Sequence, residues 1–253
     1  MTATLSEQYK MQWRWRDWEV LFGLLPSLEG KTVYDIGCAI GDHSECLAER
    51  GARVIGLDGN AELLEVARAR EIKNARFEQV DLSNFDFAAA DTADGVWTSF
   101  VAAYFTDLDK FIQNLSTLIK PGGFLAITEM DDLFGHGPGL EKYREKIEEF
   151  YRSGFDRKAY DFRSGSKLKA SIENAGLEIV KETELSDREL AFLGAAEEEI
   201  LQAWSQRLDR MPGFQKFLGE DFDDFHRDFL ACLANPNHES QCRSLFYLAR
   251  VPK

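Results

Sequence analysis

The chain is poor in the features that mark several common classes of protein. Its 253 residues include only four cysteines and six prolines, no run of lysine and arginine, and no stretch near the ~20 apolar residues of a membrane span. The 30 basic residues against 44 acidic residues give a formal net charge of −14. Such a charge repels polyphosphate unless a basic patch offsets it, so we expect neither a nucleic-acid nor a membrane partner.

The cysteines form no metal-binding or disulfide pattern. Cys38, Cys46, Cys232 and Cys242 are isolated, and no CxxC pair or His–Cys cluster is present. We expect reduced thiols packed as small apolar groups, with zinc or a disulfide framework as the weaker alternative. Residues 1–7 lack the basic flank and apolar run of a secretory signal. A cytoplasmic protein without a bound metal is therefore expected.

What the chain does contain is an alternation of short apolar runs with amphipathic segments. The apolar runs predict strands at 32–36, 53–57, 77–80, 95–100, 124–128, 177–181 and 244–250. The segments between them predict helices at 44–50, 60–70, 108–119 and 165–174. Strands that alternate with helices form right-handed βαβ units. The sequence therefore predicts an α/β fold around a mainly parallel sheet.

Further helices are expected outside this core. One covers residues 5–25, with Trp15 and Trp18 on its packed face and Trp13 on the other; another covers 139–153. Residues 187–234 look wholly helical, which is long for a connection between strands and suggests an inserted cap. The expected divisions are an N-terminal cap helix at 1–29, a core at 30–184 with a helical insertion at about 135–163, a helical cap insertion at 185–240, and the final core strand at 241–253.

The turn after the first strand is rich in small residues. Val33 to Asp42 is VYDIGCAIGD, which lets a ligand approach the start of the next helix. A dinucleotide fingerprint would have a small residue at position 42, where Asp42 would repel a pyrophosphate. The chain also lacks the GKS or GKT of a P-loop. A ligand with a nucleoside and an amino acid but no phosphate fits this turn better.

The same stretch resembles the first motif of the class I S-adenosylmethionine-dependent methyltransferases. Four further pieces follow in matching order and spacing: GLDGN (56–60), VDL (80–82), WTSFVAAYF (97–105) and LIKPGGFLAI (118–127). The resemblance covers about residues 31–130. It implies a doubly wound, seven-stranded, mainly parallel sheet whose last strand is antiparallel, with the N-terminal helix and helical insertions as caps. It also implies S-adenosylmethionine as cofactor and S-adenosylhomocysteine as product, with the methyl passing by in-line displacement to an N, O or C atom of a small molecule.

The resemblance further implies which residues hold the methionine half of the cofactor. Gly37, Ala39 and Gly41 would form the floor beneath it, and Asp35 would help to hold the loop and the amino group. Ala39 stands where the family usually has glycine.

The nucleoside half would be held at the ends of the next two strands. Asp58 would accept hydrogen bonds from the ribose hydroxyls, and Asp81 would accept from the adenine amino group, with the Leu82 amide facing the ring. Gly59 occupies a cofactor-binding position where the family often has an apolar side chain.

Ser99 and Phe100, at the end of the fourth strand, would border the methionine and the transferred methyl. Trp13 and Tyr104 are candidates to line the substrate pocket, with surface contact as the alternative for Trp13. No acid lies near Ser99 in the sequence, where magnesium-dependent relatives place one, so a metal is not expected. No NPPY-like tetrapeptide follows, which argues against methylation of exocyclic base nitrogens.

The segment after the fifth strand supplies the candidates for a base. Glu129, Asp131 and His136 would orient the acceptor or remove its proton, because methyl transfer needs a base only if the nucleophile must lose a proton. His136 is favoured among the four histidines because His43, His226 and His238 fall on predicted helices or a remote loop. The ordinary imidazole pKa of ~6.5 also suits proton transfer near neutrality. The alternative is that both acids are solvated and His136 caps a turn.

Three rival functions stay open. The chain could be a nicotinamide-dependent oxidoreductase, an enzyme that consumes S-adenosylmethionine without methyl transfer, or a non-catalytic subunit that only binds it. The sequence leaves the oligomeric state open between monomer and homodimer.

Overall fold

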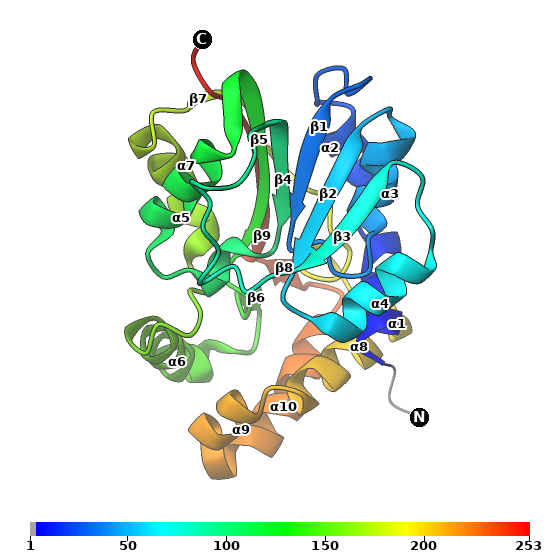
Figure 1. The fold of residues 1–253 in the computed structure, drawn as a ribbon. Helices are drawn as coiled ribbons and strands as arrows, with labels where there is room; N and C mark the ends of the chain where they lie inside the picture. The colour runs from blue at the N-terminus through cyan, green and yellow to red at the C-terminus, as the bar shows by residue number, and fades with distance from the viewer. Residues whose placement is uncertain (1–3) are drawn as a thin grey trace.

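A seven-stranded sheet forms the centre of the protein (Figure 1), as a computed structural model covering residues 4–253 shows. Its strands are β1 (Thr32–Ile36), β2 (Arg53–Asp58), β3 (Ala75–Gln79), β4 (Ala93–Ser99), β5 (Ile119–Asp131), β7 (Glu178–Glu184) and β9 (Arg243–Arg250). The spatial order is β3-β2-β1-β4-β5-β9-β7. The first five are parallel, and β9 is antiparallel to both neighbours. The predicted fold class is confirmed.

Helices cover both faces of this sheet. They are α1 (Leu5–Arg14), α2 (Trp18–Phe22), α3 (Asp42–Glu49), α4 (Ala61–Ala69), α5 (Leu108–Thr117), α6 (Arg144–Asp156), α7 (Ser164–Asn174), α8 (Glu198–Asp209), α9 (Pro212–Leu218) and α10 (Phe222–Leu233). One hydrophobic core lies between the sheet and helices α5 and α7, and a second lies between the sheet and helices α2 and α3. The inner strands β2, β1, β4, β5 and β9 are mostly buried on both faces, which explains their continuous apolar runs, whereas the edge strands β3 and β7 are largely exposed.

A third hydrophobic core lies away from the sheet. Helices α6 and α8–α10 gather at the end of the molecule below the sheet (Figure 1). They bury an aromatic cluster around Phe134 and Trp204, joined by Phe214, Phe225 and Phe229. The phenylalanines spaced along 214–229 therefore build the interior of this cap.

Two expected helices differ from the observed ones. The segment 5–25 divides into α1 and α2 at Trp15–Asp17, because Arg16 leaves the helical path to form a bridge with Asp187. Trp15 and Trp18 consequently enter different cores, the cap and the sheet, instead of sharing one face. Residues 187–197 are irregular, so the block 187–234 is not wholly helical.

A small second sheet was not predicted from the sequence. Strands β6 (His136–Gly137) and β8 (Glu239–Ser240) pair antiparallel and tie the segment after β5 to the end of the cap. Of the expected division 1–29, residues 1–3 lie outside the described residues. Within residues 4–253 no helix is long and apolar enough to cross a membrane.

Candidate functional site

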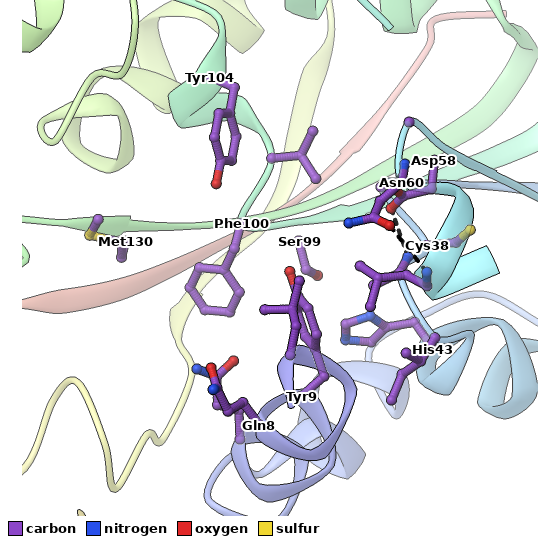
Figure 2. Close-up of a pocket in the computed structure, with 18 of the residues that line it drawn as sticks. Gln8, Tyr9, Cys38, His43, Asp58, Asn60, Ser99, Phe100, Tyr104 and Met130 are labelled. Carbon is purple, nitrogen blue, oxygen red and sulfur yellow. Dashed lines mark hydrogen bonds between the residues drawn. The ribbon is translucent and has the colours of Figure 1, made fainter. Parts of the chain in front are cut away.

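A cavity of about 1030 Å³ lies at the carboxyl ends of the parallel strands. Ligands of open α/β sheets bind at this edge. One side of the cavity, the cofactor end, is formed by the turns after β1, β2, β3 and β4. The opposite side, the cap end, is formed by α1, the segment around Leu190, and the end of α8. Figure 2 shows Gln8 and Tyr9 on α1 facing Ser99 and Phe100.

The turn after β1 supplies the floor of the cofactor end. Gly37 has φ +75° and donates from its amide to the Leu57 carbonyl at 2.7 Å. A β-carbon at Gly37 would lie 2.2 Å from a methyl of Val101, so glycine is required there. Ala39 lines the cavity with φ +45°, a left-handed conformation that costs a residue with a β-carbon some energy.

Gly41 and Asp35 were expected to contribute to this part of the cofactor site, but neither residue lines the cavity. Gly41, with φ +84°, caps α3 but does not line the cavity. Asp35 is 1% exposed and accepts a hydrogen bond from the Ser44 hydroxyl at 2.6 Å. Burial raises the pKa of Asp35 to about 7. Asp35 therefore holds the first turn of α3 to the sheet, and the expectation that it also faces the ligand is corrected.

Asp58, at the end of β2, is fixed by two backbone donors. The Ala39 amide donates to one carboxylate oxygen and the Asn60 amide to the other, each at 2.8 Å (Figure 2). Each oxygen retains a lone pair toward the cavity that Asp58 lines. A pair of fixed acceptors of this kind suits vicinal hydroxyls.

The turn after β3 forms the outer wall of the cofactor end. Gly59, Asp81 and Leu82 all line the cavity. Asp81 accepts from the Asn84 side chain at 2.6 Å and from the Ser83 amide at 2.9 Å, and these hydrogen bonds lower its pKa. Asp81 is exposed and charged, and suits an amino group.

The end of β4 reaches the middle of the cavity. The Ser99 hydroxyl is buried and has no hydrogen-bond partner among residues 4–253. Phe100 has φ +57°, and its ring lies 4.6 Å from the Arg16 guanidinium. An orphaned hydroxyl beside a glycine-lined cradle fits a bound polar group, and the residues present accordingly fit the cofactor implied by the motifs.

Both expected substrate residues line the cavity. Trp13 stacks on Trp18 with ring centroids 5.8 Å apart, so it packs inward instead of lying on the surface. Tyr104 is 63% exposed and points toward Phe100 (Figure 2). Its ring meets that of Tyr160 edge-on at 4.9 Å.

His136 lies elsewhere, which corrects its assignment as the base. The β6–β8 pairing carries it away from the cavity, where it is 6% exposed and its Nδ1 lies 3.0 Å from Nε2 of His238. Burial, together with His238, lowers the pKa of His136 to about 3. A weakly basic imidazole outside the cavity cannot remove a proton from a ligand inside it.

Glu129 and Asp131 also face away from the cavity. Glu129 is fully buried and accepts from the Ala103 amide at 3.0 Å and from the Met130 amide at 2.9 Å. Burial raises its pKa to about 7. Asp131 accepts from the Ser166 amide at 3.1 Å, which attaches β5 to α7. Both acids position backbone, so their expected contact with the acceptor is corrected as well.

His43 lines the cavity, although its place on a helix led the sequence reasoning to set it aside. It lies within an aromatic group and meets the Trp18 ring edge-on at 4.3 Å. Burial, with a smaller effect of the Arg16 charge, lowers its pKa to about 3. Its position directly after the glycine turn was the available signal, because the start of that helix faces the ligand.

A buried network of ion pairs at the cap end was also not predicted from the sequence. Arg16 contacts Asp187 at 2.7 Å and Glu189 at 2.9 Å, and Arg207 contacts Glu189 from α8. Asp187 and Glu189 are each 1% exposed. Nothing in the sequence pairs residue 16 with residue 187, so only the fold could reveal this network.

Asp42 forms an ion pair, which weakens the prediction that its charge would repel a pyrophosphate. The Arg70 guanidinium contacts its carboxylate at 2.6 Å. Its charge is therefore partly compensated, and Asp42 alone does not exclude a phosphate ligand. Within residues 4–253 no group of three or more His, Cys, Asp or Glu side chains could hold a metal ion, and the four cysteines are free thiols.

Comparison with known proteins identifies the central part of the chain. Residues 34–127 match the family model described as a methyltransferase domain. The trans-aconitate 2-methyltransferase of Deinococcus radiodurans is 31% identical over 42% of this chain and 41% of its own length. That of Delftia acidovorans is 26% identical over 63% of this chain and 64% of its own length. The chain thus spans between two fifths and two thirds of these relatives.

The fold is shared with solved methyltransferases. The geranyl diphosphate C-methyltransferase of Streptomyces coelicolor, solved with Mg²⁺, geranyl diphosphate and S-adenosylhomocysteine, superimposes with a TM-score of 0.56 at 17% identity. The superposition covers 92% of this chain and 78% of that one. It includes both the sheet and much of what surrounds it.

Proposed function

We propose that this chain, whose residues 34–127 match a methyltransferase domain, is a class I enzyme that moves the methyl group of S-adenosylmethionine to a small-molecule acceptor. One observation carries the proposal. A continuous cavity joins the acceptors at the ends of β2 and β3 to a wall from α1 and the cap. Its volume of about 1030 Å³ is at the top of the ~300–1,000 Å³ range of single-ligand pockets, which leaves room for a cofactor and an acceptor together.

The cofactor end takes the cofactor in this proposal. Gly37 and Ala39 lie beneath the methionine half, Asp58 accepts from the ribose hydroxyls, and Asp81 accepts from the adenine amino group. The fixed carboxylate of Asp58 and the close approach allowed at Gly37 support these roles.

Gly59 and Leu82 border the adenine in the same proposal. Both line the cavity between Asp58 and Asp81. Gly41 and Asp35 act from behind the floor, by holding the start of α3.

The acceptor lies between the cofactor and the cap. When bound, S-adenosylmethionine supplies a methyl group that its sulfonium charge has already activated. This chain then has to orient the acceptor and exclude water, and both raise the rate of an in-line displacement. Ser99 and Phe100 border the methyl, and Trp13 and Tyr104 border the acceptor. The acceptor atom stays open between nitrogen, oxygen and carbon.

The expected divisions of the chain fit this role. The segments 1–29, about 135–163 and 185–240 close over the core at 30–184 and 241–253. We place the protein in the cytoplasm, as a monomer or homodimer, and its four free thiols are compatible with that reducing compartment.

Thermal denaturation with and without ligand tests the cofactor first. A ligand at ~100 times its dissociation constant adds about 2.7 kcal/mol to the free energy of unfolding. We expect S-adenosylmethionine and S-adenosylhomocysteine to raise the melting temperature and NADH to leave it unchanged. Stabilisation by NADH alone would contradict the proposal.

Turnover with methyl-labelled cofactor then separates the remaining alternatives. Label should move to a member of a panel of small acids, amines and phenols. Loss of S-adenosylmethionine without any acceptor would indicate an enzyme that consumes it, and binding without turnover would indicate a non-catalytic subunit.

A further inference from the structure

The two ends of the cavity carry opposite charge. The acids that line it are Asp58 and Asp81, which lie at or just after strand ends, and Asp42, which begins α3 and pairs with Arg70. The bases that line it are Arg16, Arg207 and Arg210, all from the cap end. A cationic end is unexpected in a chain of net charge −14, so it needs a specific reason.

The ion pairs of the cap end involve two of its three arginines. Asp187 and Glu189 pair with Arg16, and Glu189 also pairs with Arg207. Arg210 forms no ion pair with any residue in 4–253. Asp209 and Glu189 act on Arg210 through their charges, but within residues 4–253 no carboxylate pairs directly with its guanidinium.

Arg207 has an unused donor at the same place. Its Nε is buried and has no hydrogen-bond partner among residues 4–253. A buried donor without a partner is costly, and the guanidinium is always charged. The guanidinium carbon of Arg207 lies 5.1 Å from the centroid of the Trp204 ring.

Arg207 lies in the last turn of α8, and Arg210 is the residue that directly follows the helix. They are three residues apart at the end of the helix, a spacing that places side chains next to each other. Burial and the Arg207 charge lower the pKa of Arg210, and the charges of Asp209 and Glu189 offset this only in part. The negative end of the helix dipole favours a cation there but does not explain the unused Nε.

We infer that the acceptor carries an anionic oxygen group, a carboxylate or a phosphate, which Arg207 and Arg210 bind at the cap end of the cavity. Guanidinium groups recognise both anions through charged hydrogen bonds. The anion directs the rest of the acceptor toward Phe100 and Tyr104. This inference rests on the proposed function, because it names the substrate class of the same cavity.

Titration calorimetry tests the inference with defined probes. The probes are tricarballylate, its uncharged trimethyl ester and inorganic phosphate, each added at constant ionic strength with and without saturating S-adenosylhomocysteine. The variants are Arg210→Gln and, as control, Arg152→Gln. Arg152 is an exposed arginine of α6 that forms no ion pair within residues 4–253.

We expect at least one of the two anions to bind, with a dissociation constant at least tenfold higher in Arg210→Gln and unchanged in Arg152→Gln. The ester should show no dependence on Arg210. Preference for tricarballylate indicates a carboxylate acceptor, and preference for phosphate indicates a phosphorylated one. Binding of neither anion, or equal binding to both variants, would overturn the inference. If anions bind through Arg210 but S-adenosylhomocysteine does not bind at all, the proposed function fails while the anion site stands.

Discussion

The cofactor end and the cap end of the cavity are built in opposite ways. At the cofactor end each group sits within a few residues of a strand, and its contacts are mostly local: Asp58 accepts from Asn60, and Asp81 accepts from Ser83. At the cap end the ion pairs join Arg16 to residues more than 170 positions away. The cofactor end thus follows from the sheet itself, whereas the cap end exists only after the whole chain has folded.

Removing Arg16 should produce the largest effect and show how much of the cap depends on it. Arg16→Met leaves Asp187 and Glu189 buried without their partner, so we expect the free energy of unfolding to fall by about 3–5 kcal/mol. Urea denaturation at pH 7 measures this loss. Arg14→Met is the control, because Arg14 is exposed and forms no ion pair within residues 4–253. A loss below ~1 kcal/mol would mean that the network does not hold the cap.

A β-carbon at Gly37 should disturb the cofactor end instead. Gly37→Ala combines a left-handed backbone with a 2.2 Å approach to Val101, and we expect a loss of about 2–4 kcal/mol. Gly30→Ala is the control, with φ +69° but nothing within 4 Å, and should cost about 1–2 kcal/mol. Adding Val101→Ala to Gly37→Ala removes the methyl group that the new β-carbon meets. The double variant should therefore regain part of the unfolding free energy by which Gly37→Ala falls below Gly30→Ala.

The affinity for S-adenosylhomocysteine should distinguish Gly37→Ala from Arg16→Met more clearly than the free energy of unfolding does. S-adenosylhomocysteine binding, measured calorimetrically where each variant is folded, should weaken more in Gly37→Ala than in Arg16→Met. If binding weakened more in Arg16→Met than in Gly37→Ala, the cofactor end would not be the part of the cavity that holds this ligand.

Two buried acids of the sheet, Asp35 on β1 and Glu129 on β5, should make the stability of the protein depend on pH in the same way. Burial raises the folded-state pKa of Asp35 and of Glu129 to about 7, above the ordinary values of 3.8 and 4.5. Each protonated acid stabilises the fold fully below its ordinary pKa, and this contribution is lost as pH rises toward 7.

Neutral replacements should remove this dependence. Asp35→Asn or Glu129→Gln should each flatten the slope of unfolding free energy against pH by up to ~1.4 kcal/mol per pH unit between pH 5 and 7. Urea denaturation at pH 5, 6, 7 and 8 measures the slope. Asp91→Asn, at an exposed position, should leave the slope unchanged. Unaltered slopes in the two buried-site variants would show that these acids stay ionised.

Asp81 should give the smallest effect, confined to the cofactor end. Its carboxylate is exposed and its hydrogen bonds are local, so Asp81→Ala should weaken S-adenosylhomocysteine binding about fivefold with little change in stability. Asp91→Ala serves as the exposed control. Affinity equal to that of the unmodified protein would remove Asp81 from the adenine role.

Features of the fold that depend on residues close in sequence were predictable, whereas features that depend on distant contacts were not. The strands, the glycine turn and Asn60 as the cap of α4 were predictable because each depends on neighbours within a few residues. The prediction for His136 was wrong because the segment after β5 does not continue toward the ligand. Its pairing with Ser240, more than 100 residues away, turned it into the cap interior.

The sequence by itself determined the α/β sheet and the positions of Asp58 and Asp81 at the edge of the sheet, and its motifs indicated the cofactor that we propose. Periodicity and turn chemistry act over a few residues, and parallel strands bring their carboxyl ends together whatever covers them. Only the tertiary structure decided that Glu129, Asp131 and His136 face away from the cavity and that Arg207 and Arg210 face it. Burial and ion pairing depend on contacts between segments distant in sequence, and local patterns carry no record of those contacts.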